Sequence, residues 1–136
     1  MHFVTGGAFN GKRAWVKNLL NNECHWISSY QGEEFPNPTT FKGKVVLEGM
    51  EQWTKKYSRE HWRENLKQWL VWEKESADRQ VIVIGTDIMK GIVPMEKEHR
   101  NWRDLTGWVY QDIVSLSSRV DIIWYGINQT IKEEEL

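Results

Sequence analysis

A glycine-rich segment near the N-terminus has the residue types and the spacing of a phosphate-binding loop. Two glycines are separated by four residues and followed by a lysine, and a short apolar run precedes them. The glycines let the backbone curl so that successive amides point at phosphate oxygens, and the following helix and lysine add positive charge. The predicted nucleotide-binding residues are Gly6, Gly7, Ala8, Phe9, Asn10, Gly11, Lys12 and Arg13. The alternative is a tight strand-to-helix turn in which Lys12 is only a surface residue.

The last residue of this loop departs from the usual pattern. Arg13 stands where such loops normally place a serine or threonine, whose hydroxyl binds magnesium. An arginine cannot bind the ion, and its positive charge repels a metal placed beside it. We therefore expect GTP or ATP as the ligand, with Mg2+ disfavoured and with Arg13 able to contact phosphate directly.

Two carboxylates stand at the ends of predicted strands. Glu48 closes the run KVVLE, and Asp87 closes the run VIVIGTD. Ligands of α/β folds bind at the carboxyl ends of the strands, so Lys12, Glu48 and Asp87 are the predicted catalytic residues. Glu48 is also the predicted metal ligand. Acids at such positions also serve as helix caps or surface charges, and that alternative stays open.

The elements that must position these residues alternate along the chain. β-branched or apolar runs predict strands at 2–5, 24–30, 44–48, 80–87 and 119–125, and three- and four-residue spacing predicts helices at 11–22, 49–57, 59–76 and 99–117. Strands that alternate with helices indicate an α/β fold with right-handed crossovers, and continuous apolar runs indicate a mostly parallel sheet flanked by helices. Residues 31–43 contain two prolines and two glycines and are predicted to form a surface loop.

Nine tryptophans are an unusual number for 136 residues. Trp62, Leu66 and Trp69 recur at helical spacing and form one apolar face. Such a stripe could stack on bases or on a corrin-like ring. Packing of the helix onto the sheet is the favoured role, because buried tryptophans contribute large apolar area to a core.

Composition argues against several classes of protein. Eighteen basic and nineteen acidic residues leave a formal charge of −1, which argues against a nucleic-acid-binding protein. No apolar stretch approaches the roughly 20 residues needed for a membrane span, and the N-terminus does not resemble a secretory signal. The single cysteine, Cys24, fits a reducing, cytoplasmic environment. The length favours a single domain over residues 1–132, followed by a solvated tail over 133–136.

Four segments together resemble the bifunctional adenosylcobinamide kinase/adenosylcobinamide-phosphate guanylyltransferase family. FVTGGAFNGK resembles the family's opening strand and loop, usually V-T-G-G-A-R-S-G-K-S, and KVVLEGMEQW resembles its acidic strand. VIVIGTDIMKGIVPMEKEHRNWRDLTGWVYQ resembles V-V-x-V-[ST]-N-E-V-G-x-G-I-V-P followed by R-x-F-R-D-x-x-G-x-x-N-Q. VDIIWYGINQTIK resembles the closing strand. The residues in register in the third segment are Gly91, Ile92, Val93, Pro94, Arg103, Asp104, Gly107 and Gln111.

The resemblance implies a P-loop NTPase-like three-layer fold and an oligomer. It implies a cytoplasmic enzyme of cobalamin biosynthesis that phosphorylates adenosylcobinamide with ATP or GTP and then transfers GMP through a guanylylated histidine. By position, Gly6 to Lys12 would hold the nucleotide phosphates, Glu48 would be the acidic site residue, and Asp87 would line the same cleft. The implied partners are a nucleotide and a corrinoid substrate, cobinamide.

The chain departs from the family where the histidine is expected. The segment that carries the guanylylated histidine is shortened to SSYQGEEFPNPTTFKG, which contains no histidine. His25 lies out of register, and His61 and His99 lie on predicted helices elsewhere. Three readings follow: a kinase without guanylyl transfer, a non-catalytic nucleotide- or corrinoid-binding regulatory homologue, or an α/β domain whose glycine loop is only a turn.

Overall fold

The protein is built on one six-stranded sheet, seen in a computed structural model that describes residues 1–88 and 96–134. The strands are β1 (His2–Gly6), β2 (His25–Ser28), β3 (Lys44–Glu48), β4 (Gln80–Thr86), β5 (Arg119–Trp124) and β6 (Ile127–Glu133). Their order across the sheet is β2-β3-β4-β1-β5-β6. The first five strands pair in parallel, and β6 pairs antiparallel with β5. The carboxyl ends of β1, β3 and β4 therefore meet at one edge of the sheet.

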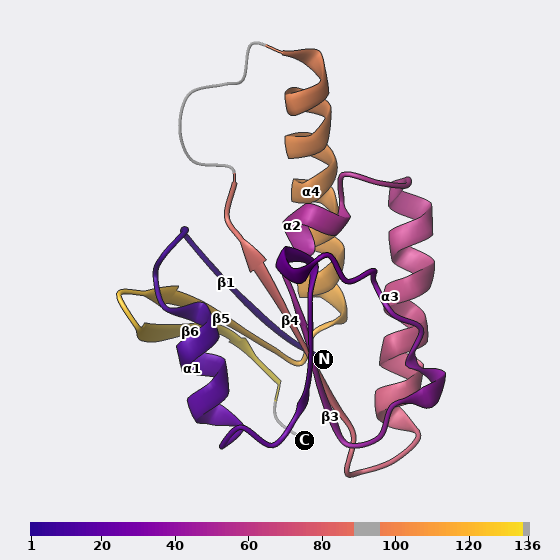
Figure 1. Cartoon of the computed structure of the whole chain (residues 1–136), viewed down its shortest axis with the longest axis vertical. Helices are drawn as coiled ribbons and strands as arrows, with labels where there is room; N and C mark the ends of the chain where they lie inside the picture. The colour runs from indigo at the N-terminus through magenta and orange to yellow at the C-terminus, as the bar shows by residue number, and fades with distance from the viewer. Residues whose placement is uncertain (89–95, 135–136) are drawn as a thin grey trace.

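Helices cover both faces of this sheet (Figure 1). The helices are α1 (Lys12–Leu19), α2 (Met50–Trp53), α3 (Arg59–Lys74) and α4 (Lys97–Leu116). Val16 and Leu20 of the α1 region pack on Val4, Ile82 and their neighbours on one face. The other face packs against α2, α3 and α4 in the larger core cluster. The predicted three-layer α/β fold with a mostly parallel sheet is confirmed.

The predicted apolar runs are the buried centre of the sheet. Val45, Val46 and Leu47 of β3 are fully buried, and so is the run from Val81 to Ile84 in β4 within a few per cent. Side chains of successive strand residues point to opposite faces, so only a strand covered on both sides keeps such a run dry. None of the helices in the described ranges combines the length and apolar character needed to cross a bilayer.

Several elements differ from the predicted ranges. The helix expected over 49–57 is only four residues long, and the strand expected over 24–30 gives way after Ser28 to a 3-10 turn, Ser29–Gln31. β6 was not predicted at all. It includes Glu133, and the Glu134 amide donates to the Ser118 carbonyl at 2.8 Å, while both residues are exposed.

The tryptophan stripe is core, as the favoured interpretation of its spacing predicted. Trp62, Leu66 and Trp69 are almost completely buried. Two indoles also donate hydrogen bonds to the loop over 31–43, which the sequence predicted to be a surface loop. Trp69 donates to the Pro36 carbonyl at 3.0 Å and Trp72 to the Phe41 carbonyl at 3.2 Å. A buried indole N–H needs an acceptor, and the loop backbone supplies it.

Candidate functional site

The glycine loop runs from the end of β1 to the first turn of α1 and is shaped by residues with positive φ. Gly6 has φ 149°, Phe9 has φ 61° and Gly11 has φ 87°. A Cβ on Gly6 would lie 2.5 Å from the Ile123 carbonyl oxygen of β5, so only glycine fits there. Gly11 is the N-cap of α1 and no side chain caps the helix, which leaves its first amides without an intrahelical acceptor.

Lys12 folds back over the loop rather than extending into solvent. Its Nζ donates to the Gly7 carbonyl oxygen at 2.8 Å, and the residue is only 9% exposed. Burial lowers the pKa of Lys12, and the charges of Glu51, Glu48 and Asp87 oppose that shift. A lysine held inside the turn and close to three acids differs from the surface lysine of the simple-turn alternative.

Arg13 and Glu48 form a two-bond ion pair across the site. Arg13 Nε donates to Glu48 Oε2 at 2.7 Å, and Arg13 Nη2 donates to Glu48 Oε1, also at 2.7 Å. The Trp26 indole adds a third donor to Oε1 at 3.2 Å. Burial disfavours the charged form of Glu48, but these hydrogen bonds outweigh it and lower its pKa. The carboxylate therefore stays ionised and is neutralised by arginine.

This pairing bears on the metal that the family pattern implies. Magnesium in phosphate-binding loops is held by a hydroxyl and a carboxylate. Here the hydroxyl is replaced by Arg13, and both oxygens of Glu48 accept hydrogen bonds from its guanidinium. The residues present do not fit Mg2+, and the metal role expected for Glu48 does not suit this arrangement.

A second acid in the site, Glu51, was not predicted from the sequence. It lies in α2, is 4% exposed, and accepts hydrogen bonds from the Thr86 amide at 2.9 Å and from the Tyr30 hydroxyl. Burial, followed by the hydrogen bond to Glu51, raises the pKa of Tyr30, which keeps the phenol protonated. The available signal was the spacing Glu-x-x-Glu, because a strand-end acid and a first-turn acid can share one cleft.

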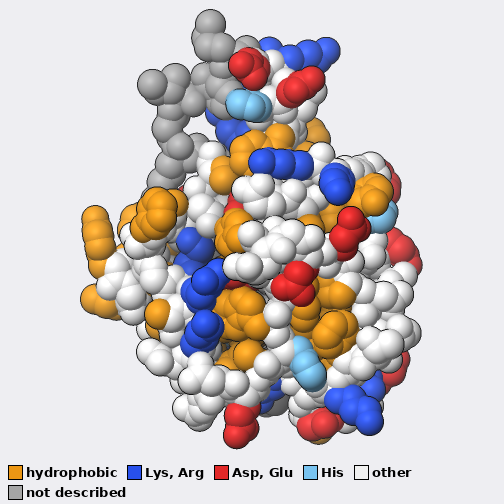
Figure 2. All heavy atoms as spheres, viewed as in Figure 1, with side chains coloured by type: hydrophobic (Ala, Val, Ile, Leu, Met, Phe, Trp, Pro, Cys, Tyr) orange, Lys and Arg blue, Asp and Glu red, His pale blue; other side chains and the backbone are white. Residues whose placement is uncertain are grey.

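These residues line a cleft of about 780 Å³ at the carboxyl edge of the sheet. The loop contributes the segment from Ala8 to Ala14, and facing it are Tyr30, Glu48, Glu51, Gln52, Thr86 and Trp102, among others. Figure 2 shows basic side chains grouped on the face where α1 lies, next to exposed apolar side chains. A ligand in this cleft would meet the loop on one side and the acids on the other.

The remaining predicted residues have distinct places. Ala8 and Phe9 are exposed at the rim of the cleft, and the Asn10 carbonyl accepts the Gly126 amide of the β5–β6 turn at 2.8 Å. The Asp87 amide donates to the Gly6 carbonyl at 2.8 Å, and its charge acts on Lys12. The predicted motif residues Gly91 to Pro94 lie outside the described residues.

The four histidines lie away from the described lining of this cleft. His25 packs edge-on against Phe41, His61 stacks on Tyr57, and His99 stands beside Glu96 at the start of α4. His2 is buried with Asp121 in the sheet. No histidine is among the described residues that line the cleft.

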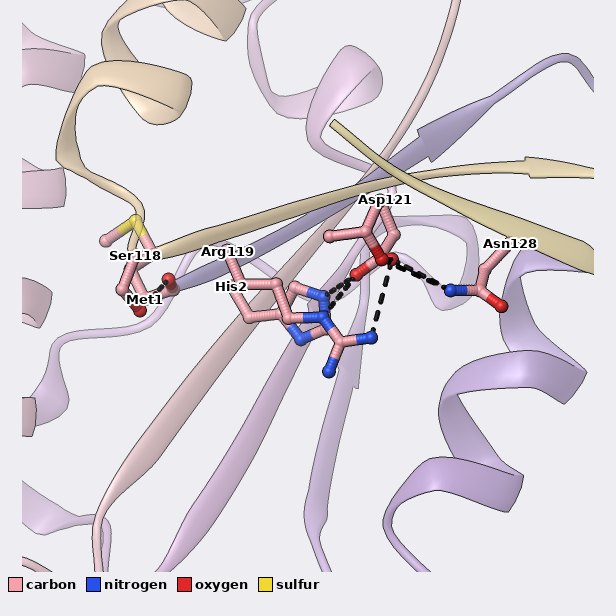
Figure 3. A network of polar contacts seen from close by, with 7 residues as sticks. Met1, His2, Ser118, Arg119, Asp121 and Asn128 are labelled. Carbon is pink, nitrogen blue, oxygen red and sulfur yellow. Dashed lines mark hydrogen bonds and ion pairs between the residues drawn. The ribbon is translucent and has the colours of Figure 1, made fainter. Parts of the chain in front are cut away.

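Asp121 is the centre of a second charged cluster (Figure 3). Its carboxylate accepts hydrogen bonds from His2 at 2.6 Å, Arg119 at 2.8 Å, Thr130 at 2.6 Å and Asn128 at 3.1 Å. The Asp121 side chain is completely buried. With four side-chain donors on two oxygens, this acid ties β1, β5 and β6 together and offers nothing to a ligand.

Comparison with known proteins agrees with the resemblance seen in the sequence. The model of the family described as cobinamide kinase / cobinamide phosphate guanyltransferase matches residues 38–131. That range includes Glu48, Glu51 and Asp87 and begins after the glycine loop. No curated protein matches the chain. Proteins of this family are P-loop nucleotide-binding enzymes of cobalamin biosynthesis, and the match covers well over half of the chain. The protein belongs to the cobinamide kinase / cobinamide phosphate guanyltransferase family.

Proposed function

We propose that this family member binds the phosphates of ATP or GTP in the glycine loop and transfers the terminal phosphoryl group to the hydroxyl of cobinamide. Lys12 would neutralise the transferring phosphate, and the amides at the start of α1 would bind its oxygens. The cleft in front of the loop would hold the acceptor hydroxyl. Guanylyl transfer is not proposed, because no histidine lines the described part of the cleft.

The observation that carries this proposal is the position of Lys12. Its ammonium lies 2.8 Å from the Gly7 carbonyl, inside a turn that opens onto the cleft, and burial already weakens its proton affinity. A phosphate between the loop amides and the ammonium would replace that intramolecular contact with stronger charge-assisted hydrogen bonds. The low exposure of Lys12 limits the hydration lost on binding, which favours a preorganised anion site.

The test is a turnover assay with matched lysine variants. Purified protein incubated with cobinamide and ATP or GTP, with and without Mg2+, is expected to form cobinamide phosphate. Lys12→Ala should abolish the product, whereas Lys67→Ala, on the exposed face of α3, should not change it. Absence of product from the unmodified protein, while another family member is active in parallel, would contradict the kinase proposal.

A second function is favoured by the Arg13–Glu48 ion pair. Arg13 replaces the hydroxyl that would bind a metal ion, and it occupies both oxygens of Glu48. This arrangement suits a non-catalytic homologue that binds nucleotide or corrinoid and regulates a partner. This version predicts saturable binding of GTP, ATP or cobinamide by calorimetry without any turnover. It also predicts that Lys12→Ala removes nucleotide binding. A protein that binds none of the three ligands would have neither function.

We also propose that the protein is a homo-oligomer. Among the described strands β6 pairs only with β5, and it exposes Ile127 and Ile131, which are 71% and 52% accessible. An exposed apolar edge strand is commonly covered by a partner. Light scattering coupled to size-exclusion chromatography should give a mass above that of one chain, and a monomeric mass at assay concentrations would exclude the oligomer.

A further inference from the structure

The ion pair between Arg13 and Glu48 places a fixed positive charge beside the nucleotide loop. Arg13 follows Lys12 directly, so its side chain emerges from the first turn of α1. Glu48 ends β3, two strands away from β1 in the sheet order. Nε and Nη2 of Arg13 each donate a hydrogen bond of 2.7 Å to Glu48, and together the two bonds fix the plane of the guanidinium.

The guanidinium keeps donors for a further partner. An arginine has five N–H donors, and the pair with Glu48 uses one on Nε and one on Nη2, which leaves about three. The Arg13 side chain is 49% exposed, and Arg13 lines the cleft together with Lys12 and Glu51. The remaining donors can therefore reach an anion in the cleft while Glu48 still holds the group.

Glu48 is the less exposed partner and acts as the anchor. Its side chain is 5% exposed, and Trp26 donates to the same carboxylate at 3.2 Å. A divalent ion would have to displace two charge-assisted hydrogen bonds and sit against a cation to reach these oxygens. The geometry opposes a metal at the position where the family pattern puts one, and it supplies a cation that the protein carries itself.

We propose that Arg13, oriented by Glu48, is a phosphate ligand that takes the place of the divalent metal, so that the protein binds metal-free nucleotide. This inference rests on the proposed nucleotide site. Arg13 contacts the phosphates and sets the specificity for the metal-free form, and Glu48 is a positioning residue. Arginine suits this role because its planar fork can bridge a carboxylate and a phosphate at the same time.

The deciding experiment measures the dissociation constants of ATP and GTP by calorimetry in chelator and in excess Mg2+. The unmodified protein is expected to bind more tightly in chelator than in excess Mg2+. Arg13→Ser, which restores the hydroxyl of the family pattern and frees Glu48, should bind about tenfold or more weakly in chelator and regain affinity with Mg2+. Mn2+ mixed with nucleotide should give the paramagnetic resonance spectrum of a protein-bound ion only with Arg13→Ser.

Two controls separate the outcomes. Arg13→Lys keeps the charge but loses the fork, so it should bind nucleotide more weakly than the unmodified protein and still more tightly in chelator than with Mg2+. Circular dichroism of each variant verifies that it is folded. If the unmodified protein binds nucleotide equally well or more tightly with Mg2+, the metal-replacement proposal is wrong while the proposed nucleotide site stands. If it binds no nucleotide in either condition, both fail.

Discussion

The two buried carboxylates, Glu48 and Asp121, have similar hydrogen-bond partners but lie in different surroundings. Each is paired with an arginine and accepts further hydrogen bonds. The Asp121 side chain is completely buried, and its partners come from its own strand β5 and from the neighbouring strands β1 and β6. Glu48 stands at the carboxyl end of its strand, and its arginine is 49% exposed to a cleft. Arg119 is itself 33% exposed, so the two clusters differ mainly in the burial of the acid and in the place of Glu48 at the carboxyl end of its strand.

Of the substitutions in the two clusters, replacement of Asp121 is expected to lower stability the most. Asp121→Asn should lower the free energy of unfolding by about 3 kcal/mol, because it leaves Arg119 poorly compensated and presents an amide to donors. Glu48→Gln should cost about 1 kcal/mol or less, since the exposed Arg13 can be hydrated instead. Urea denaturation midpoints of the two variants provide the measurement. Equal losses would mean that the two centres are equally structural.

A second variant tests how closely the β5–β6 turn packs against the glycine loop. A Cβ on Gly11 would lie 3.2 Å from the Gly126 Cα, and Gly11 has φ 87°. Gly11→Ala should destabilise the fold by about 2 kcal/mol through backbone strain and contact with the turn. It should also weaken nucleotide binding.

Gly32→Ala is the matched control for this substitution. Gly32 has φ 79°, but a Cβ there would meet nothing within 4 Å. It should show the strain of the left-handed backbone without the steric contact. If Gly32→Ala lowers stability as much as Gly11→Ala does, steric contact between the β5–β6 turn and the loop contributes nothing to the effect at Gly11.

The sequence was sufficient for the parts of this architecture that depend on local patterns. The apolar runs of β3 and β4 predicted buried parallel strands, and the spacing of Trp62, Leu66 and Trp69 predicted a core face of α3. The spacing of Gly6, Gly11 and Lys12 predicted the turn between β1 and α1. In each case the periodicity of one element determines which side it buries.

Features that depend on pairing between distant segments were beyond such patterns. Strand β6 is exposed along most of its length, so it has no apolar alternation to reveal it. Arg13 and Glu48 are 35 residues apart, and His2 and Asp121 are 119 apart, so only the order of strands brings them together. Arg13 was recognised as a departure from the loop pattern, but its partner could not be chosen among the acids of the chain.

A third prediction concerns the pH dependence of stability that arises from the Asp121 cluster. Burial lowers the pKa of His2 below 6.5, although the hydrogen bond to Asp121 opposes that shift. Between the lowered pKa and the ordinary value, the unfolded chain binds more protons than the folded one, so stability falls as pH falls through that window. Asp121 also has a lowered pKa, since its hydrogen bonds outweigh the opposing effect of burial, and it extends the loss to lower pH.

His2→Gln separates this histidine from the other acid-sensitive groups. Glutamine keeps an N–H donor for Asp121 but cannot titrate, so it should cost about 1 kcal/mol at neutral pH. The loss of stability below pH 6.5 should then be shallower than in the unmodified protein. Unfolding followed by tryptophan fluorescence across the pH range gives both quantities. An unchanged slope would mean that His2 does not titrate in this window.

The smallest expected effect is the coupling energy between Arg13 and Glu48. Its size in stability and in ligand affinity shows whether the pair is structural or serves the ligand. A double-mutant cycle with Arg13→Met and Glu48→Gln should give a coupling energy of about 0.5–1 kcal/mol in stability, because one partner is half exposed and its charge is screened by water. The same cycle measured on nucleotide affinity should give a larger coupling, since a bound phosphate displaces that water and the cation then depends on its anchor. If stability carries the larger coupling, the pair is a structural tie like the Asp121 centre. A larger coupling in affinity would instead place the main role of the pair at the ligand, as the exposed donors of Arg13 suggest.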